Sequence, residues 1–441
     1  MGEKAPVVTM EEAERLLAPL AAFDAIVLAV SGGPDSMALM HLAAEWFARH
    51  PDTLRKVLVI TVDHGLRPES AQEAHFVLQC AAKLALPHRT LEWEGEKPAR
   101  GIPASARAAR YLLLESAALG LGGASVCIVS AHTRDDQAET FLMRLKRGSG
   151  LDGLSAMAPR TSLREESSVT LLRPLLDVPK VRLIATLEAR GVNWVEDPTN
   201  ACLDYERPAL RVALSRLSDE GIGADAIATS ARRLGEAREA MDYAVARFTE
   251  TLELSFNDEI YSSLSRSAFD AGPAHLRMRV LAHLISRFGG ASPVPQLSEV
   301  EDMVKRMSSD GRLTATLGGA VVTTTARQVK VWREAGRVDV APMTLDHSGV
   351  WQTWDRRFRV RTRRGVEGVE VGMLGETDRQ TLVGPLLDPR CRLPAAAVAA
   401  LPAFRVQGKL VAVPSLQAYL QADPAMDLSG GEELDAEPLC H

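Results

Sequence analysis

The sequence predicts an α/β protein whose first part is a doubly wound parallel sheet, followed by a helical domain and a small mixed α/β domain. Two observations carry this prediction. Apolar, strand-like runs alternate with helical patterns over roughly the first 215 residues, and long amphipathic helices and short alternating segments fill the remainder. Strands that alternate with helices pair in parallel, so helices are expected on both faces of the sheet.

Four strands are expected in the first part, separated by helices. The strands cover residues 25–30, 56–62, 88–93 and 126–131, and the helices between them cover 37–50, 70–83 and 105–118. In parallel sheets of this kind, ligands bind beyond the carboxyl ends of the strands. These ends carry a turn that starts at Ser31, the pair Asp63 and His64, and His132. We therefore expect these polar groups to meet at one edge of the sheet.

The first strand passes directly into a turn made of Ser31, Gly32, Gly33, Pro34, Asp35 and Ser36. A strand, a glycine turn and a helix N-terminus present backbone N–H groups to one point, which favours an anion such as phosphate. The glycines allow close approach, the two serines can donate hydrogen bonds, and Asp35 can hold a magnesium ion. A turn that only connects the strand to the helix is the alternative.

The turn sequence SGGPDS lacks the lysine of a Walker A loop and the spacing of the GxGxxG dinucleotide motif. It resembles the loop of the N-type ATP pyrophosphatases, the PP-loop enzymes, which have a Rossmann-like sheet. This resemblance implies ATP as a substrate, cleavage between its α- and β-phosphates, and Mg²⁺ as a cofactor.

Acidic residues follow His132 in the segment AHTRDDQAET. Helical spacing can place Asp135 or Asp136 beside Glu139 on one face of the helix that begins here. Such carboxylates could bind Mg²⁺, a cationic substrate, or both. Taken alone, acidic residues also favour a helix N-terminus electrostatically, and a single histidine is often a hydrogen-bonded core residue. The sheet edge shared with the phosphate loop favours the functional interpretation.

The composition is that of an ordinary globular protein, with 24% charged residues, 46% hydrophobic residues and a net charge of −6. No apolar run approaches the roughly 20 residues that span a bilayer, and the N-terminal segment lacks the features of a signal peptide. We expect a cytoplasmic protein that does not associate with a membrane. The five cysteines form no CxxC pair, which argues against a disulfide framework, a zinc site or an iron–sulfur cluster.

Seven motifs in order narrow the resemblance to one family. They are SGGPDS from Ser31, VDHGLR from Val62, ARAARY from Ala106, AHTRDDQAET from Ala131, RGSGLDGL from Arg147, RPLL from Arg173 and WVEDPTN from Trp194. Together they are similar to the tRNA(Ile)-lysidine synthetase family, and they span essentially the first 215 residues. The chain departs from the family at Pro208, where asparagine is common, so a role of that amide does not carry over.

The resemblance implies a two-step reaction on the wobble cytidine, position 34, of an isoleucine tRNA with a CAU anticodon. The cytosine C2 oxygen attacks the α-phosphate of ATP and releases pyrophosphate. The ε-amine of free L-lysine then attacks C2 and expels AMP, which leaves lysidine. The loop from Ser31 to Ser36 and Mg²⁺ would stabilise the leaving pyrophosphate, with Asp35 and Asp136 as metal ligands.

The acidic segment receives its role from the same resemblance. Asp135, Asp136 and Glu139 could recognise the ammonium groups of lysine. Lysine must react as the neutral amine although its pKa lies near 10.4, so a base must remove a proton. One of these carboxylates or His132 could accept it, and the sequence leaves this choice open.

Basic and nucleoside-binding residues complete the implied site. Asp63 and His64 would lie near the adenosine. Arg107 and Arg110 are candidates for the α-phosphate or the tRNA, because a guanidinium can bind phosphate oxygens bidentately. Further contacts to tRNA are expected from Arg147, Arg207 and Arg211.

The later part of the chain is less explicit. Amphipathic helices are expected at 227–248 and 275–288, and a β-hairpin at 312–332. We therefore predict four segments: a PP-loop catalytic domain at 1–215, a mainly helical tRNA-binding domain at 216–340, a small mixed α/β tRNA-binding domain at 345–425, and an acidic, disordered tail at 426–441.

An arginine-rich strand is expected in the third segment, at RRFRVRTRR from Arg356. Alternation along a strand would place Arg357, Arg359, Arg361 and Arg363 on one face, as a track for an RNA backbone. The alternative is a solvated edge strand whose charges prevent aggregation. Six arginines in nine residues create a concentrated field and favour RNA.

Other functional classes stay open at this point. Another PP-loop enzyme, such as a tRNA thiolase or an amide synthetase, shares the loop, although thiolases generally need cysteines in a suggestive motif. A non-catalytic RNA-binding protein that kept the fold is more remote, because Asp35 and the acidic group from Asp135 to Glu139 are intact. The oligomeric state is also open, with a homodimer as one alternative.

Overall fold

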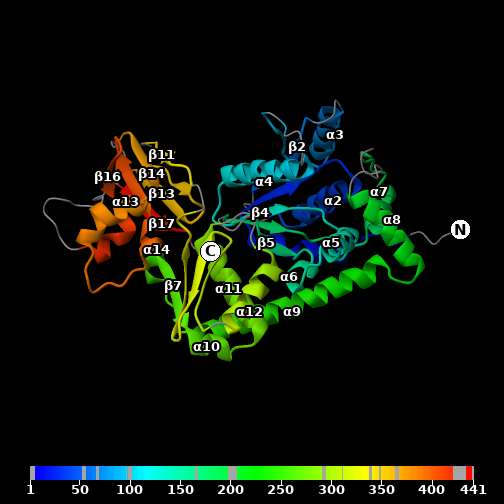
Figure 1. Cartoon of the computed structure of the whole chain (residues 1–441). Helices are drawn as coiled ribbons and strands as arrows, with labels where there is room; N and C mark the ends of the chain where they lie inside the picture. Colours follow the sequence, from blue (N-terminus) through cyan, green and yellow to red (C-terminus); the bar gives the residue numbers. More distant parts are fainter. Residues whose placement is uncertain are drawn as a thin grey trace. The chain divides into compact units, whose positions relative to one another are not determined.

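The computed structural model describes most of the chain. The described residues are 5–51, 56–65, 69–95, 97, 102–163, 167–196, 206–290, 295–309, 311–336, 340–346, 349–362, 367–420 and 434–439. They belong to two compact units, residues 1–239 and 240–441 (Figure 1). The division falls inside helix α9 (Ala224–Glu250), later than the boundary predicted at 215. Arg238 of α9 donates to Ser155 Oγ at 3.2 Å, so the first half of this helix belongs to the first unit.

The first unit is built on a six-stranded sheet in the order β3-β2-β1-β4-β6-β5. Its strands are β1 (Ala25–Ala29), β2 (Lys56–Asp63), β3 (His88–Glu92), β4 (Val126–Val129), β5 (Arg160–Ser162) and β6 (Val169–Leu172). All neighbours are parallel except β5, which is antiparallel to β6. The predicted doubly wound sheet is confirmed. The strand order reverses around β1, which has β2 on one side and β4 on the other, and such a switch point is where these sheets bind ligands.

Helices cover both faces of this sheet. They are α1 (Met10–Leu17), the 3-10 turn η1 (Ala18–Ala22), α2 (Pro34–Arg49), α3 (Ser70–Lys83), α4 (Ile102–Leu121), α5 (Arg134–Lys146), α6 (Leu151–Leu154), α7 (Lys180–Ala189) and α8 (Glu206–Asp219). The alternating side chains of β1 explain the two layers. Ile26 and Leu28 lie in one hydrophobic core with residues of α2 and α7, whereas Val27 packs in the other core with Leu114 of α4. This burial on both faces accounts for the continuous apolar run of the strand.

The second unit begins with helices packed on an antiparallel sheet. The helices are α10 (Arg266–Ala271), α11 (Ala274–Gly289) and α12 (Leu297–Ser309), after the short turn η3 (Asn257–Glu259). The sheet has the order β7 (Tyr261–Ser265), β10 (Gln328–Arg333), β9 (Ala320–Thr324), β8 (Leu313–Leu317). The predicted amphipathic helices correspond to α9 and α11, and the predicted hairpin is present as part of this sheet.

Two small antiparallel sheets and a second core follow. One sheet has the order β11 (Met343–Thr344), β14 (Val369–Met373), β15 (Pro402–Val406), β16 (Lys409–Ala412), and the other has the order β12 (Gln352–Trp354), β13 (Phe358–Thr362), β17 (Leu434–Pro438). The short helices are α13 (Glu376–Asp378), η4 (Arg379–Val383), η5 (Gly384–Leu386), α14 (Ala395–Ala399) and η6 (Pro414–Tyr419). The buried apolar side chains of this part form one core together with Ile260, and Tyr261 and Trp332 of the preceding sheet pack against it. The core therefore extends into the segment that was predicted as the helical domain.

The prediction of a disordered tail is wrong for residues 434–438. These residues form β17, which pairs antiparallel with β13. Leu434 is buried, and the carboxylates of Asp435 and Glu437 pair with Arg361 and Arg359. The acidic side chains that suggested disorder therefore have cationic partners on the neighbouring strand.

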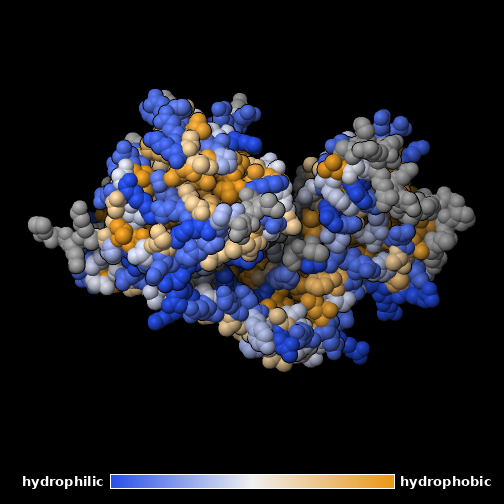
Figure 2. Space-filling view, turned by 180° about the vertical axis from the view of Figure 1, so that it is seen from behind, coloured by the Kyte–Doolittle hydropathy of each residue, from blue (hydrophilic) through white to orange (hydrophobic). Residues whose placement is uncertain are grey.

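One face of the molecule can be followed in a space-filling view. Figure 2 shows hydrophilic residues over much of the face seen from behind, with smaller apolar patches between them. In the part of the chain that the structure describes, no helix has both the length and the apolar character needed to cross a membrane.

Candidate active site

The predicted phosphate loop joins β1 to α2. Gly33 is the N-cap of α2, and Pro34 occupies the first helical position, where its fixed φ suits the helix. Gly32 has a φ of +88°, a conformation that other residues rarely adopt. Its carbonyl oxygen accepts a hydrogen bond from the Val195 N–H at 2.9 Å. The loop is thus tied to the segment that carries the WVEDPTN motif, of which residues 197–200 lie outside the described part.

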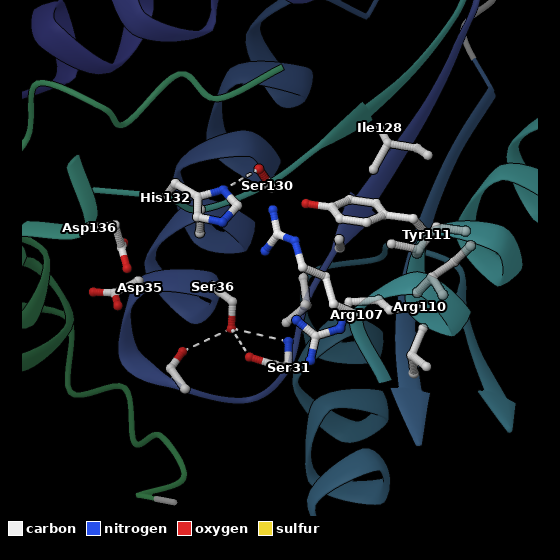
Figure 3. A pocket seen from close by; sticks show the side chains of 17 residues that line it. Ser31, Asp35, Ser36, Arg107, Arg110, Tyr111, Ile128, Ser130, His132 and Asp136 are labelled. Carbon is white, nitrogen blue, oxygen red and sulfur yellow. Dashed lines mark hydrogen bonds between the residues drawn. The ribbon is translucent and has the colours of Figure 1, made fainter. Parts of the chain in front are cut away.

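Hydrogen bonds within the loop hold its shape. The Ser31 N–H donates to Ser36 Oγ at 3.2 Å, and Ser36 Oγ donates to the Gly33 carbonyl at 2.9 Å (Figure 3). The two serine hydroxyls lie 3.3 Å apart. The N-terminus of α2 and its dipole remain directed at the space beyond β1, as a phosphate site requires.

A pocket of about 210 Å³ lies at the carboxyl ends of β1, β2 and β4. Its polar lining consists of Ser31, Gly33, Asp35, Ser36, Arg107, Arg110, Tyr111, Ser130, His132 and Asp136, and its apolar lining includes Ala29, Ile60, Val62, Leu114 and Ile128. The structure therefore brings together eight residues that the sequence predicted for the site. Six others are not part of the lining: Gly32, Pro34, Asp63, His64, Asp135 and Glu139.

Two carboxylates, those of Asp35 and Asp136, lie close together at one side of the pocket (Figure 3). Asp136 is the third residue of α5 and completes a capping box, because its Oδ2 accepts from the Thr133 N–H at 2.8 Å and from Thr133 Oγ1 at 2.9 Å. Asp35 Oδ1 is buried and has no hydrogen-bond partner among the described residues. Burial raises the pKa of Asp35, and the negative charges of Asp136 and Asp135 add to this effect.

This arrangement suits a magnesium ion. Mg²⁺ prefers oxygen ligands and is usually held by one or two carboxylates together with substrate phosphates. Asp35 and Asp136 would supply the carboxylates, and a bound cation would give the unpartnered Asp35 oxygen a partner. Within the described ranges, there is no group of three or more His, Cys, Asp or Glu side chains that could hold a metal ion.

One cationic residue at this site was not predicted from the sequence. Lys180 Nζ lies 3.1 Å from Asp35 Oδ2. The lysine is the first residue of α7, directly after the segment that follows the RPLL motif. The signal available in the sequence was weak, because a lysine at a helix start is ordinary and Asp35 is 145 residues away.

Asp135 and Glu139 are each bound to other parts of the protein. Asp135 Oδ2 accepts a hydrogen bond from the Lys180 backbone N–H at 2.7 Å and so fixes the start of α7. Glu139 is 3% exposed and accepts from Arg211 Nε at 2.6 Å, with Arg207 Nε at 4.0 Å. Burial raises the pKa of Glu139, and Arg211 opposes the shift. Both carboxylates hold neighbouring helices in place.

Helix α8 brings in the basic residues that the sequence assigned to tRNA. Arg207 and Arg211 face Glu139, and Arg147 Nη2 lies 2.9 Å from Glu206 Oε2. Pro208 is buried in the first turn of α8. A proline is compatible with this turn because the first backbone N–H groups of a helix have no intrahelical acceptor. The departure from the family at this position therefore does not disrupt the helix.

His132 lies at the end of β4, next to the carboxylate pair. Its Nδ1 is 2.8 Å from Ser130 Oγ. Burial lowers the pKa of His132 to about 4, although Asp136 opposes the shift. The imidazole is therefore neutral near pH 7 and suited to hydrogen bonding rather than to carrying a charge.

Two arginines of α4 lie across the pocket from the carboxylates (Figure 3). The Arg107 guanidinium stacks over the Tyr111 ring, with its carbon 5.0 Å from the ring centre. Arg110 Nη2 donates to His64 Nε2 at 3.1 Å. Burial lowers the pKa of His64, and Arg110 adds to this shift. Asp63 Oδ1 accepts from the Gly65 N–H at 2.8 Å and so stabilises the turn after β2.

In the second unit, the expected arginine track is only partly present. The prediction is wrong for Arg357, which is 4% exposed, pairs with Asp355 and donates to the Ala400 carbonyl. A turn at Asp355 and Arg356, with φ of 50° and 53°, precedes the strand, so the alternation does not extend back to Arg357.

The exposed side of the same strand keeps two of the predicted arginines. Arg359 and Arg361 share one face, and their guanidinium carbons lie 4.7 and 4.3 Å from the centre of the Trp351 ring. Both also pair with carboxylates of β17. Arg363 lies outside the described residues. Arg359 and Arg361 therefore stack on Trp351 and are partly neutralised by carboxylates, so they do not form a row of free cations.

Known proteins similar to this chain share one domain type. Residues 7–217 match a family described as the PP-loop domain. The chain is 43% identical to a tRNA(Ile)-lysidine synthase of Bradyrhizobium diazoefficiens, over 76% of this chain and 94% of the relative. It is 37% identical to the tRNA(Ile)-lysidine synthase of Ruegeria pomeroyi over 94% of both chains. A solved structure, the U34-tRNA thiolase NcsA from Methanococcus maripaludis, matches 52% of this chain and 78% of its own, with 15% identity and a TM-score of 0.43.

The relatives match well beyond the PP-loop domain, and the chain covers nearly their full length. The matched domain contains the glycine loop, the carboxylate pair and the arginines that surround the pocket. From these findings we conclude that the chain is a member of the tRNA(Ile)-lysidine synthase family, built on an ATP-using PP-loop domain.

Proposed function

We propose that this protein joins L-lysine to C2 of the wobble cytidine of a tRNA(Ile) with a CAU anticodon and converts ATP to AMP and pyrophosphate. One observation supports this most strongly. The phosphate loop, the Asp35 and Asp136 carboxylates and the α4 arginines surround a single pocket at the switch point of the sheet. The substrates are a tRNA and ATP, so we also propose a cytoplasmic location.

In the first step, the cytosine O2 attacks the α-phosphorus. The bond between the α-phosphorus and the bridging oxygen breaks, and pyrophosphate leaves with the bonding electrons. The N–H groups of the loop and the N-terminus of α2 would stabilise the charge on pyrophosphate, and Arg107 and Arg110 would bind the α-phosphate from the other side. When held by Asp35 and Asp136, Mg²⁺ supplies further neutralisation of the phosphate oxygens.

In the second step, the neutral ε-amine of lysine attacks C2. The bond between C2 and its oxygen breaks, AMP leaves with the electron pair, and the new C–N bond loses its extra proton to a base. Of the three acidic residues predicted to bind lysine, only Asp136 lines the pocket, because Asp135 and Glu139 are bound to α7 and α8. We therefore assign the contact with the lysine ammonium to Asp136. Asp136 and His132 both line the pocket, so we propose that one of these two residues accepts the proton.

The tRNA contacts are proposed on two surfaces. Arg207 and Arg211 lie at the helix that packs beside α5, where exchange of a carboxylate for a phosphate partner is chemically reasonable. Arg359 and Arg361 form the second surface together with Trp351. Replacing both by glutamine should weaken tRNA binding and reduce its dependence on salt. Arg390→Gln is the matched control, since that side chain is 90% exposed in the same unit. Equal salt dependence in the double variant and the wild type would exclude this surface.

The decisive experiment measures the products. Purified protein is incubated with Mg·ATP, transcribed tRNA(Ile) with the CAU anticodon, and L-lysine, each omitted in turn. AMP and pyrophosphate are quantified, and the digested tRNA is analysed by mass spectrometry. We expect lysidine at position 34 only when all three substrates are present. Release of ADP and orthophosphate would refute the proposal, and a sulfur-containing or unmodified nucleoside with AMP release would indicate a different PP-loop reaction.

A further inference from the structure

Arg110 is held at the pocket by a histidine. The guanidinium belongs to the pocket lining together with that of Arg107, three residues earlier on α4. In the described part of the chain, the Arg110 side chain bonds to His64 and not to a carboxylate. A salt bridge would fix the guanidinium but would also neutralise it, whereas a neutral partner leaves its charge available to an anionic ligand. His64 itself is not part of the lining.

We propose that His64 is a positioning residue that orients Arg110 toward the α-phosphate of ATP, through a neutral imidazole that fixes the guanidinium without neutralising it. This inference rests on the proposed contact between Arg110 and the α-phosphate. It deepens that proposal, because it gives His64 a function exerted through another residue in place of a contact with the adenosine.

Two N–H groups of Arg110 converge on one nitrogen of the imidazole. Arg110 Nη2 lies 3.1 Å and Nε 3.4 Å from His64 Nε2. A contact along this edge fixes the plane of the guanidinium and leaves Nη1 on the side away from the ring for an anion. Arginine only donates hydrogen bonds, so His64 Nε2 must be the acceptor. The ring proton of His64 is therefore assigned to Nδ1.

The imidazole is fixed in turn by the ends of β2 and β3. Asp63 and Gly65 on either side of it form the turn after β2 through their hydrogen bond. The Trp93 ring packs edge-on against His64, with the ring centres 5.9 Å apart. The Trp93 N–H donates to the Asp63 carbonyl at 2.8 Å, and the Lys97 ammonium lies 4.8 Å from the Trp93 ring centre. The acceptor nitrogen thus has a defined position before any ligand binds.

The charges around His64 favour the neutral ring that this role requires. Burial lowers the pKa of His64, Arg110 and Lys97 lower it further, and Asp63 opposes the shift. These three are the charged groups that act on the ring among the described residues. A protonated imidazole could not accept the bond and would repel Arg110. Arg107 is held in a similar way, by the uncharged ring of Tyr111.

A direct contact between His64 and the nucleoside is the competing explanation. The two explanations differ in the ligands that they affect. A residue that acts through Arg110 changes the affinity only for ligands with an α-phosphate. A residue that contacts the nucleoside changes the affinities for adenosine and AMP equally.

The test measures the affinities of the full-length protein for AMP and for adenosine by calorimetry, with lysine and tRNA absent. We expect His64→Ala to weaken AMP binding about tenfold and to leave adenosine affinity within about twofold. His64→Gln should restore most of the AMP affinity, because its amide oxygen can accept the bond from Arg110 without titrating. In an Arg110→Gln background, His64→Ala should cause no further loss, since His64 acts through this guanidinium.

His88→Ala is the matched control. His88 is also a half-buried histidine of the sheet, but its Nε2 lies 2.9 Å from the Thr61 hydroxyl and it does not line the pocket. This variant should bind AMP and adenosine as the wild type does.

A spectroscopic measurement reports the imidazole directly. In protein labelled with nitrogen-15 histidine, the signals of His64 at neutral pH should show a proton on Nδ1 and none on Nε2. The chain has ten histidines, so these signals are identified by their absence from His64→Gln.

Four results would each overturn the inference: unchanged AMP affinity of His64→Ala, an equal loss for AMP and adenosine, a further loss of AMP affinity in the Arg110→Gln background, or a proton on His64 Nε2. Thermal unfolding of each variant separates misfolding from a binding defect. If His64→Ala unfolds, His64→Gln and the tautomer of the wild type still decide the question. Wild-type protein that shows this coupling but makes no lysidine would refute only the proposed function.

Discussion

Replacing Asp136 by asparagine separates the two tasks of this side chain. Its Oδ2 accepts hydrogen bonds from the Thr133 N–H and Oγ1 at 2.8 and 2.9 Å. An asparagine carbonyl can accept the same two bonds, so the free energy of unfolding should fall by no more than about 1 kcal/mol. The negative charge at the pocket is lost, and with it the proposed ligand for the metal and for the lysine ammonium.

The expected effect on catalysis is large. If the missing charge removes about 4 kcal/mol of transition-state stabilisation, the rate of lysidine formation falls about 10³-fold, at about 1.4 kcal/mol per tenfold change. The rate is measured from pyrophosphate release and from lysidine in digested tRNA, and stability is measured by urea unfolding. Thr133→Ala is the control, because it removes a capping hydroxyl but keeps the carboxylate. Turnover of Asp136→Asn within tenfold of the wild type would refute this reasoning.

Three further predictions concern stability and pH. Asp355→Asn leaves the buried guanidiniums of Arg333 and Arg357 without their carboxylate, so the free energy of unfolding should fall by about 3–5 kcal/mol. As a control, Asp388→Asn, at an exposed ion pair with Arg390, should give no measurable change. A loss below about 1 kcal/mol for Asp355→Asn would contradict the buried network. Gly32→Ala places a side chain at a backbone φ of +88°, so the free energy of unfolding should fall by roughly 1–2 kcal/mol and ATP binding should weaken. Thermal unfolding and calorimetry measure these two effects, and wild-type values for both would be inconsistent with a strained loop. The pKa of His132 is lowered from 6.5 to about 4, so the unfolded chain binds more protons than the folded chain between these pH values, and stability should increase as the pH rises through this range. In urea unfolding, His132→Gln should reduce this increase between about pH 5 and pH 6.5. An identical pH dependence in both proteins would argue against the shift.

Local patterns predicted the centre of the site because each was complete within a few residues. The apolar run of β1, the glycine turn and the start of α2 follow one another without a gap, and the parallel order of the strands then places His132 at the same edge. The long amphipathic helices and the hairpin were predicted for the same reason, since their periodicity is visible within one segment.

The incorrect predictions concern side chains whose surroundings are set by the folded chain and not by the local pattern. The alternation predicts Arg357 on an RNA-binding face, but a left-handed turn at Asp355 precedes it, and Arg357 is buried, where it shares the Asp355 carboxylate with Arg333 and donates to the Ala400 carbonyl. The tail was expected to be disordered, but its carboxylates meet arginines that lie 74 and 78 residues earlier. The charge of a segment does not reveal which segment will neutralise it.

By itself, the sequence determined the parallel sheet, the phosphate loop and the group of residues around one pocket, because each depends on short-range patterns of apolar, glycine and polar residues. Only the tertiary structure decided which acidic residues line the pocket and which ones pair with neighbouring helices. Packing of α7 against α2 and of α8 against α5 brings Lys180 to Asp35 and Arg211 to Glu139. Electrostatic pairing depends on distance in space, and the chain reaches those distances only when the helices are packed.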